Sequence, residues 1–420
     1  MKKLYILASA IFGLASIQQS SAQCNGRYQT DIYSVVDTTF DIQYGSNTDL
    51  ANNPVNLMMD IYQPQGDTAS MRPLIIFAHG GSFISGDKSS GEIAYLATEF
   101  AKKGYVCASI SYRLAPNAFY LVTEENTVKV VFGAIQDGKA AIRYFRKDAA
   151  TTNTYKINPD QIFIGGTSAG GILGINLTYM DDVNKLSPQW KSWANDIGGL
   201  EGASGNPGYC SRSNGTFGFA GAIADTSWVD ANDVPWYGSH AQNDQTVKYG
   251  YGKPLNGNNP VDLFGSSLIE VRLSNLGIYN HFDSYSGGDH PPFANSTTIL
   301  QDNKDSLTMF LYNILDCNPN NMQSANQKNC ATHPTAINDL ANNKLVNKIY
   351  PNPFNDAINI ELNDINNASV TIFNTMGQII LQEKITTHIY KINLDNLNAG
   401  AYFVKVTANN ESFSQTVVKK

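Results

Sequence analysis

The sequence predicts an α/β fold, a mostly parallel sheet with helices on both faces, followed by a small all-β sandwich. Three observations support this prediction. Strand and helix patterns alternate from about residue 55 to about residue 315, as in sheets built from strand–helix–strand units. Residues 318–344 are rich in Asn, Gln, Ser and Ala and poor in large apolar side chains, which predicts a linker. Beyond it, short alternating strand patterns follow one another without a helix.

The elements expected before the linker are short apolar strands separated by longer helical segments. In chain order they are an antiparallel strand at 55–62, a strand at 74–78, a helix at 92–103, a strand at 105–112, a helix at 128–147, a strand at 161–164 with the helix after it, and then strand and helix in alternation through 219–224, 235–239, 266–276 and 281–284 to a last helix at 298–315.

The most informative motif is Gly-Thr-Ser-Ala-Gly at 166–170, which directly follows the apolar strand at 161–164. Small residues around Ser168 allow the strand and the next helix to approach closely, and the tight turn pushes the serine hydroxyl out of the sheet edge. Ser168 is therefore a candidate nucleophile. A turn serine that only caps a helix is the alternative, because such motifs arise by chance in a chain with 34 glycines.

A second motif, His-Gly-Gly-Ser at 79–82, follows a buried strand. Its glycines let backbone N–H groups turn toward a reacting carbonyl. Acyl transfer through a serine places negative charge on that oxygen, and each preorganised donor lowers the energy of the charged state by about 3–4 kcal/mol. We assign the oxyanion hole to the N–H groups of Gly81, Ser82 and Ala169, and a structural role to His79. An ordinary turn at the end of the strand is the alternative.

A nucleophilic serine needs a histidine to accept its proton. The oxyanion loop, the linker and the C-terminal part hold three of the six histidines, which leaves His240, His281 and His290. His290 lies just beyond the expected last strand and precedes two prolines, so no helix continues there and a mobile base fits that loop. We expect His290 to be the base, with His281 as the alternative.

The histidine in turn needs a carboxylate to orient it. Asp244 lies in a loop after the strand at 235–239, and we expect it to be the acid. Asp283 stays open as the alternative because it is close to His290 in sequence. The remaining aspartates of this region fit solvated loops or helix caps better; they are Asp225, Asp230 and Asp233.

On these residues the chain resembles α/β-hydrolases of the carboxylesterase and hormone-sensitive-lipase-like group, and is similar to bacterial feruloyl and acetyl esterases. The order Ser168, Asp244, His290 is the chain order of nucleophile, acid and base in that fold. The resemblance spans about residues 40–317 and includes Ser-Tyr-Arg-Leu-Ala-Pro at 111–116. It implies a secreted serine carboxylic-ester hydrolase that uses no cofactor and acts on a short-chain, acetyl or aryl, feruloyl-like ester.

Three residues depart from the patterns of that group. Ser82 stands where hormone-sensitive-lipase-like enzymes have a third glycine, and Thr167 stands where they tend to have Asp and type-B carboxylesterases Glu. The expected acid is Asp244 rather than the Glu usual in type-B enzymes. The subfamily, and with it the substrate, a small molecule or an ester on a polysaccharide, therefore stays open. A peptidase or amidase on the same triad, and a surface adhesion protein with an inactive hydrolase domain, are the rival functions.

The aromatic residues between the expected nucleophile and acid suggest a binding pocket. Residues 181–216 interrupt the strand–helix rhythm with small polar residues and two tryptophans, Trp190 and Trp193, and such an insertion could cover a cleft. Trp228 follows the end of a strand and is our candidate for substrate binding. We expect Trp236, within its strand, to pack in the core.

Charge and cysteine usage restrict the compartment and the partners. A net charge of −7 and a pI near 5.4 offer no basic stripe for nucleic acid. Residues 1–22 carry two lysines, an apolar stretch and a small-residue end, which predicts a cleaved signal peptide and no membrane span in the mature chain. No Cys or His spacing predicts a metal site.

Five cysteines are an odd number for an exported chain, so at least one should be unpaired. Cys107, in an apolar strand, is expected to be a buried small hydrophobe. Cys317 and Cys330 close a short loop and are the preferred disulfide. Cys24 and Cys210 could then form the other.

The C-terminal segment resembles the sorting domain of Bacteroidetes type IX secretion. The resemblance rests on Tyr-Pro-Asn-Pro-Phe at 350–354, Asn-Thr-Met-Gly-Gln at 374–378, the strand at 399–406 and the ending Val-Val-Lys-Lys. It implies secretion or display at the cell surface through the type IX machinery. The expected organisation is a signal peptide at 1–22, a catalytic domain at 23–317, a linker at 318–344 and a β-sandwich at 345–420; a generic carbohydrate-binding module is the alternative for the last.

Overall fold

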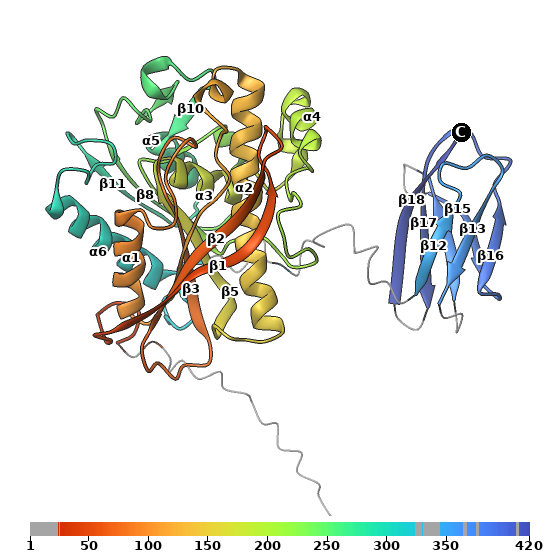
Figure 1. The fold of residues 1–420 in the computed structure, drawn as a ribbon, viewed down its shortest axis with the longest axis horizontal. Coiled ribbons are helices and arrows are strands. Elements are labelled where there is room, and N and C mark those ends of the chain that lie inside the picture. The colour runs from red at the N-terminus through yellow and green to blue at the C-terminus, as the bar shows by residue number, and fades with distance from the viewer. Residues whose placement is uncertain are drawn as a thin grey trace, which may run out of the picture. The chain divides into compact units, whose positions relative to one another are not determined.

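A computed structural model describes residues 24, 26–323, 330, 345–363, 368–374, 378–408 and 411–420. The chain forms two compact units, Met1–Pro334 and Thr335–Lys420 (Figure 1). The expected signal peptide at 1–22 and most of the expected linker lie outside the described residues. No helix in the described part of the chain is long and apolar enough to cross a bilayer.

The first unit is built on an eight-stranded sheet in the order β1-β2-β4-β3-β5-β6-β8-β11. The strands β1, β2 and β4 pair antiparallel, and all pairs from β4 to β11 are parallel. The predicted mostly parallel sheet is therefore confirmed. The bounds are β1 Val36–Thr48, β2 Pro54–Pro64, β3 Arg72–Ala78, β4 Val106–Ile110, β5 Ile157–Thr167, β6 Gly215–Phe219, β8 Trp236–Ala241 and β11 Asn280–Tyr285.

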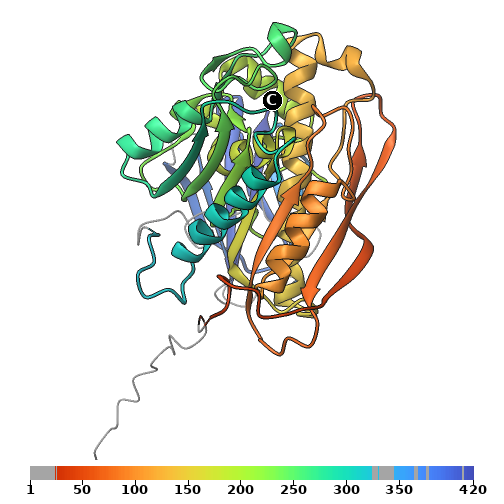
Figure 2. The same ribbon diagram turned by 90° about the vertical axis from the view of Figure 1, so that its left-hand side faces the viewer.

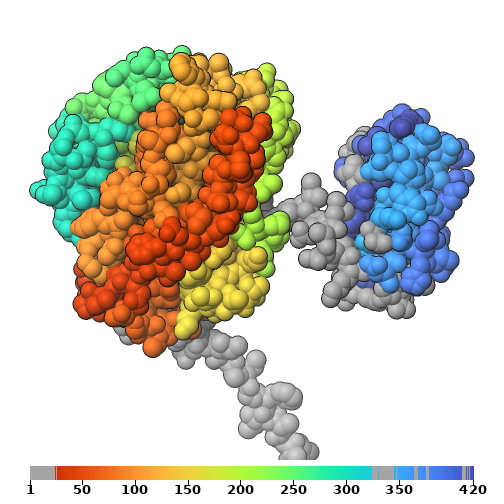
Figure 3. All heavy atoms as spheres, in the orientation of Figure 1, coloured from red at the N-terminus to blue at the C-terminus, as the bar shows by residue number. Residues whose placement is uncertain are grey.

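The first strand was not expected from the sequence. Its alternation of apolar and polar residues is broken by register shifts between Thr39 and Ile42 and between Gln43 and Gly45, and as an edge strand it buries few side chains. Figure 3 shows this strand, in red, at the surface of the unit. A half-exposed edge strand gives a weak sequence signal because neither face needs to be consistently apolar.

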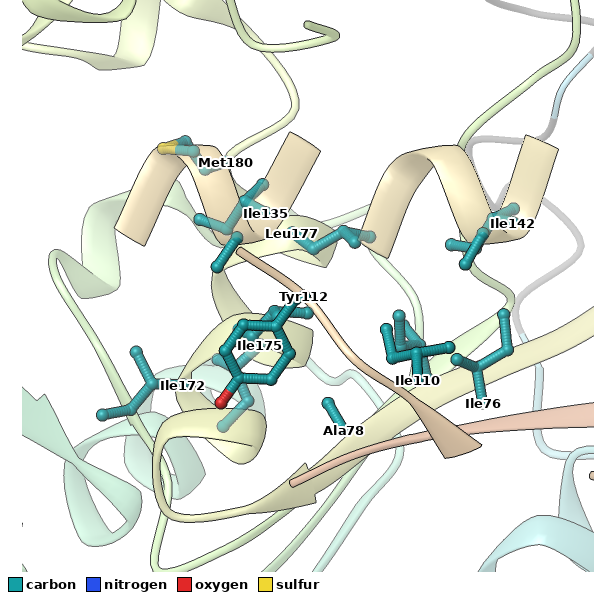
Figure 4. Packing of buried hydrophobic residues seen from close by; sticks show 14 of the residues in the cluster. Ile76, Ala78, Ile110, Tyr112, Ile135, Ile142, Ile172, Ile175, Leu177 and Met180 are labelled. Carbon is teal, nitrogen blue, oxygen red and sulfur yellow. The ribbon is translucent and has the colours of Figure 1, made fainter. Parts of the chain in front are cut away.

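Helices cover both faces of the sheet, as predicted. One face packs against α2 Glu124–Ala150, α3 Ala169–Tyr179 and α5 Ser266–Asn275, and the other against α1 Gly91–Lys102 and α6 Thr297–Asn313 (Figure 2). Figure 4 shows the first of these layers, where Ile76 and Ala78 of β3 and Ile110 of β4 face Ile135 of α2 and Ile175 of α3. Because β3 is buried on both faces, its end is held rigidly where the oxyanion loop begins.

Smaller elements lie between the strands on the side of the candidate site. A second sheet contains β7 Ala222–Ile223, β10 Leu263–Gly265 and β9 Tyr251–Gly252. The insertion at 181–216 contributes the helix α4, Pro188–Asp196. The N-cap hydroxyl of Ser187 accepts a hydrogen bond from the N–H of Trp190, and Pro188 stands at the first helical position, where its missing N–H costs nothing.

The second unit is all-β, as predicted, and forms two antiparallel sheets, β12-β13-β16 and β15-β14-β17-β18. Its apolar residues alternate along the strands and meet in one cluster. The strand β12 begins directly after the expected linker and was missed by sequence reasoning. The bounds are β12 Val346–Tyr350, β13 Ala357–Leu362, β14 Ser369–Phe373, β15 Ile379–Lys384, β16 Ile389–Asn393, β17 Gly400–Ala408 and β18 Glu411–Lys419.

The expected disulfide pairing is wrong. Cys24 pairs with Cys317, and Cys210 pairs with Cys330. The N-terminal segment packs into the same apolar cluster as the end of α6, which brings Cys24 to Cys317 across 293 residues of sequence. Short sequence spacing was a poor guide because tertiary packing decides which sulfurs meet. Cys107 is buried and free, as expected.

Candidate active site

Ser168 lies at the sharp turn between β5 and α3, with φ 54° and ψ −116°. This backbone conformation is strained for a residue with a side chain. The turn is held by the N–H of Ser168, which donates to the carbonyl of Phe219 at 2.8 Å. A Cβ atom on Gly166 or Gly170 would collide with the carbonyl oxygen of Ala78, so only glycine permits this close approach. The serine hydroxyl makes no capping bond to its helix, unlike the simple capping serine weighed as the alternative.

The hydroxyl of Ser168 instead lies against His290. The Oγ–Nε2 distance is 2.6 Å, and Nδ1 of the same ring lies 2.6 Å from Oδ2 of Asp244. A carboxylate only accepts, so Nδ1 carries the proton and Nε2 is free to accept from the serine. The structure thus brings together the three residues that the sequence singled out from positions 168, 244 and 290.

Asp244 is buried in the loop after β8, and its carboxylate is held from two sides. Oδ1 accepts the N–H groups of Thr246 at 2.8 Å and Val247 at 3.1 Å. Burial by itself raises the pKa of Asp244, but hydrogen bonds from His240 and His290 outweigh it and hold the pKa well below the usual range. The carboxylate therefore remains ionised throughout the neutral range, where it can fix the tautomer of His290.

Asp283, the alternative acid, belongs to a different cluster. It accepts hydrogen bonds from the hydroxyl of Tyr237 at 2.8 Å and from Nε2 of His281 at 3.1 Å. His281, the alternative base, is therefore paired with Asp283 along β11 and has no contact with Ser168 among the hydrogen bonds of the described chain. The two alternatives bond to each other and leave the Ser168 cluster to Asp244 and His290.

The loop after β3 bends back beside Ser168. Gly81 has φ 110° and Ser82 has φ 55°, and within the described residues neither their N–H groups nor that of Ala169 donates to a protein acceptor. Free N–H groups next to a nucleophile fit an oxyanion hole. Ser82, which replaces the third glycine, adopts a left-handed conformation that is unusual for a residue with a side chain.

His79 supports this loop rather than reacting. Its ring stacks on Tyr112 with centroids 4.3 Å apart, its Nδ1 donates to the carbonyl of Gly80 at 2.6 Å, and its own carbonyl accepts the Tyr112 hydroxyl at 2.7 Å. Burial lowers the pKa of His79, which favours the neutral ring. Tyr112 belongs to the Ser-Tyr-Arg motif at 111–113, so that motif stabilises the oxyanion loop.

A mostly apolar pocket adjoins Ser168 and Ala169. The rings of Trp228 and Trp190 meet edge to face at 6.1 Å and form part of its wall. Trp228 is held by its Nε1, which donates to the carbonyl of Lys185 at 3.1 Å, and Trp190 by a bond to Glu124 at 2.8 Å. Trp236 is fully buried, as expected of a core residue. Other apolar lining residues are Leu121, Val128, Val131, Phe132, Ile135, Ile172, Val261 and Leu263.

Two family models match the chain. Residues 59–198 match the BD-FAE family, and residues 348–420 match the secretion system C-terminal sorting domain. The first unit carries a BD-FAE α/β-hydrolase domain. The BD-FAE match contains the oxyanion loop and Ser168, and it ends before Asp244 and His290. The sorting-domain match covers nearly all of the second unit, as the sequence resemblance predicted.

Individual relatives agree with a BD-FAE domain in an exported chain. An ulvan lyase, NLR42, of Nonlabens ulvanivorans is 27% identical over 36% of this chain and 32% of its own length. A versiconal hemiacetal acetate esterase of Dothistroma septosporum is 25% identical over 35% of this chain and 40% of its own length. The chain thus spans less than half the length of either relative. Esterase 2 of Thermogutta terrifontis, a solved structure, is 19% identical over 65% of this chain and 92% of its own, with a TM-score of 0.47.

The site of the BD-FAE domain contains only protein groups that can move protons and stabilise charge. Among the described residues, no group of three or more His, Cys, Asp or Glu side chains is arranged to hold a metal ion. The arrangement can transfer a proton from Ser168 through His290, stabilise an imidazolium with Asp244 and accept a negative oxygen at the Gly81–Ser82 turn. Sequence reasoning did not connect His240 with this cluster, although it lies four residues before the acid.

Proposed function

We propose that the chain is an exported serine esterase that forms an acyl-enzyme on Ser168. The observation that carries this proposal is the continuous line of hydrogen bonds from Ser168 Oγ to His290 and on to Asp244, beside a pocket that can take an acyl group. Relatives that are named esterases and the BD-FAE match support hydrolysis of esters. Delivery by the type IX machinery, with the second unit as the address, is supported by the sorting-domain match.

In the first half of the reaction, Ser168 Oγ attacks the ester carbonyl as its proton passes to Nε2 of His290. The carbonyl oxygen becomes an oxyanion held by the N–H groups of Gly81, Ser82 and Ala169. Asp244 stabilises the positive ring of His290. His290 then returns the proton to the alcohol oxygen, the carbon–oxygen bond breaks, and the alcohol leaves.

In the second half, a water molecule enters where the alcohol stood. His290 takes a proton from that water, and the resulting hydroxide attacks the acyl carbon. The second oxyanion collapses, His290 returns the proton to Ser168 Oγ, and the free carboxylic acid leaves. Each half therefore uses the same proton acceptor and the same oxyanion hole, and no external oxidant or reductant takes part.

The acyl group is proposed to be apolar, with an aryl or short alkyl chain, because the wall beside Ser168 is largely aliphatic and aromatic. A screen over nitrophenyl esters of increasing acyl length, acetylated xylan, feruloyl esters and aminoacyl anilides tests this function. We expect ester turnover that is lost when Ser168 is replaced. Turnover of the anilides alone would favour the peptidase alternative, and no turnover of any substrate would favour an inactive domain.

Replacing Trp228 with alanine should raise KM for aryl esters by about tenfold or more, because burying an aromatic contact is worth about 1.5–3 kcal/mol. The smaller acetyl ester should be affected less. Steady-state kinetics on paired aryl and acetyl esters of one alcohol measures the difference. Trp193→Ala, on the same insertion but outside the pocket lining, is the matched control. Equal effects on both esters would show that Trp228 does not contact the acyl group.

A chain that ends at residue 344 should keep the full rate on a soluble ester, because every residue of the proposed site lies in the first unit and both disulfides are retained. In its natural host the same shortened chain should accumulate in the periplasm. Kinetics and cell fractionation measure the two expectations. Loss of turnover on a small soluble ester would place part of the site in the second unit, and loss of binding only to an insoluble polymer would favour a carbohydrate-binding module.

A further inference from the structure

His240 is fully buried on β8, and each of its ring nitrogens has polar neighbours. Nε2 lies 3.0 Å from the carbonyl oxygen of Val247 and 3.3 Å from Oδ2 of Asp244. Nδ1 lies 2.9 Å from the hydroxyl of Ser266, the first residue of α5. The ring of Tyr249 meets the imidazole edge to face at 5.7 Å. The imidazole is therefore enclosed by β8, by the loop that carries the acid and by α5.

The chemistry of these neighbours fixes where one proton of His240 must be. A carbonyl oxygen and a carboxylate oxygen can only accept, so Nε2 carries a proton that is shared between Val247 and Asp244. The same oxygen of Asp244 also accepts from His290 at 2.6 Å. One carboxylate oxygen thus lies between two imidazoles, while the other is occupied by two backbone N–H groups.

We propose that His240 is a positioning residue that holds Asp244 Oδ2 toward His290, an inference that rests on the proposed function. The bond to Val247 ties the acid loop to β8, and the bond to Oδ2 sets the rotation of the carboxylate. His240 is in turn held by Ser266, whose hydroxyl also lies 3.1 Å from the carbonyl of Gly221. The orientation of the acid is therefore set by regular elements on two sides, although Asp244 and His290 both lie in loops.

Two substitutions at position 240 separate this role from simple filling of the core. In His240→Gln the side-chain amide nitrogen can occupy nearly the place of Nε2 and donate to Asp244. In His240→Asn the shorter amide reaches only the place of Nδ1, near Ser266. Both variants keep a polar group in the same buried position. We expect His240→Asn to lower kcat about 10- to 100-fold, as loss of a partner that orients a reacting group does, with KM nearly unchanged, and His240→Gln to lose clearly less.

A double-mutant cycle with Asp244→Asn tests whether His240 acts through the acid. Once the carboxylate is gone, His240→Asn should cause little further loss of kcat. A loss of the same size in both backgrounds would overturn the proposal, as would equal losses for His240→Gln and His240→Asn. If His240→Asn fails to fold, Ser266→Ala, which frees Nδ1, takes its place in the cycle, and additive losses there would also overturn the inference.

A readout without turnover keeps this inference separate from the proposed function. The proton between His290 Nδ1 and Asp244 should give a far-downfield proton NMR signal that is absent in Asp244→Asn. We expect that signal to shift or broaden in His240→Asn and to persist in His240→Gln. An unchanged signal in His240→Asn would overturn the positioning role even if the chain hydrolysed no ester tested, whereas absent turnover with the expected signal changes would count against the esterase function alone.

Discussion

Replacing Ser168 with alanine is expected to abolish ester hydrolysis, with kcat reduced on the order of 10⁴-fold or more. The hydroxyl is the only group in the proposed mechanism that forms the acyl bond, and alanine has the same Cβ and fits the same strained turn. Steady-state kinetics measures the loss, and thermal unfolding should show a transition close to that of the unchanged chain.

A serine-reactive phosphonate extends the Ser168 experiment. It should label the unchanged chain once and leave Ser168→Ala unlabelled. Ser227→Ala is the matched control, because Ser227 is exposed next to the pocket residue Trp228 and takes no part in the proposed mechanism. Substantial turnover by a well-folded Ser168→Ala variant would exclude the acyl-enzyme mechanism.

Asp244→Asn should reduce kcat on the order of 10⁴-fold. The amide can donate a hydrogen bond to Nδ1 of His290, which favours the tautomer with the proton on Nε2. In that tautomer His290 cannot accept the proton of Ser168. KM should change little because Asp244 does not contact the substrate in the proposed mechanism.

Asp283→Asn is the matched control for the acid. Asp283 is also a carboxylate bonded to a histidine, but its partner is His281, away from Ser168, so we expect only a small loss of kcat. The reverse pattern, with Asp283→Asn inactive and Asp244→Asn active, would move the acid to Asp283. Small and equal losses would show that neither carboxylate orients the base.

The sequence predicted the features whose causes are local. Glycines on both sides of Ser168 follow from the contact of that turn with the end of β3, and strand–helix alternation follows from burial of both faces of a parallel sheet. The nucleophile, the acid and the base could be chosen because few histidines were available and each candidate followed a strand. Such reasoning needs only the residue types and their place relative to neighbouring elements.

Features that depend on long-range packing escaped it. The disulfide partners of Cys24 and Cys210 are set by how the N-terminal segment and the insertion lie against distant parts of the unit. The edge strand β1 lacks a consistent apolar face. The contact of His240 with Asp244 depends on the path of the loop after β8, which returns Val247 to the ring, and spacing alone does not reveal that path.

The two disulfides also determine how the chain responds to a pull or a cut between its units. A load applied at the C-terminal unit reaches the first unit through the sulfurs of Cys330 and Cys210, so it bypasses the segment 318–329 and does not pass along α6 into the sheet. Cys210 is braced there by Arg146, which donates to its carbonyl at 2.7 Å. A single break of the backbone between positions 317 and 330 would leave the two units joined until a reductant opened that bond, whereas a break after residue 330 would release the second unit at once.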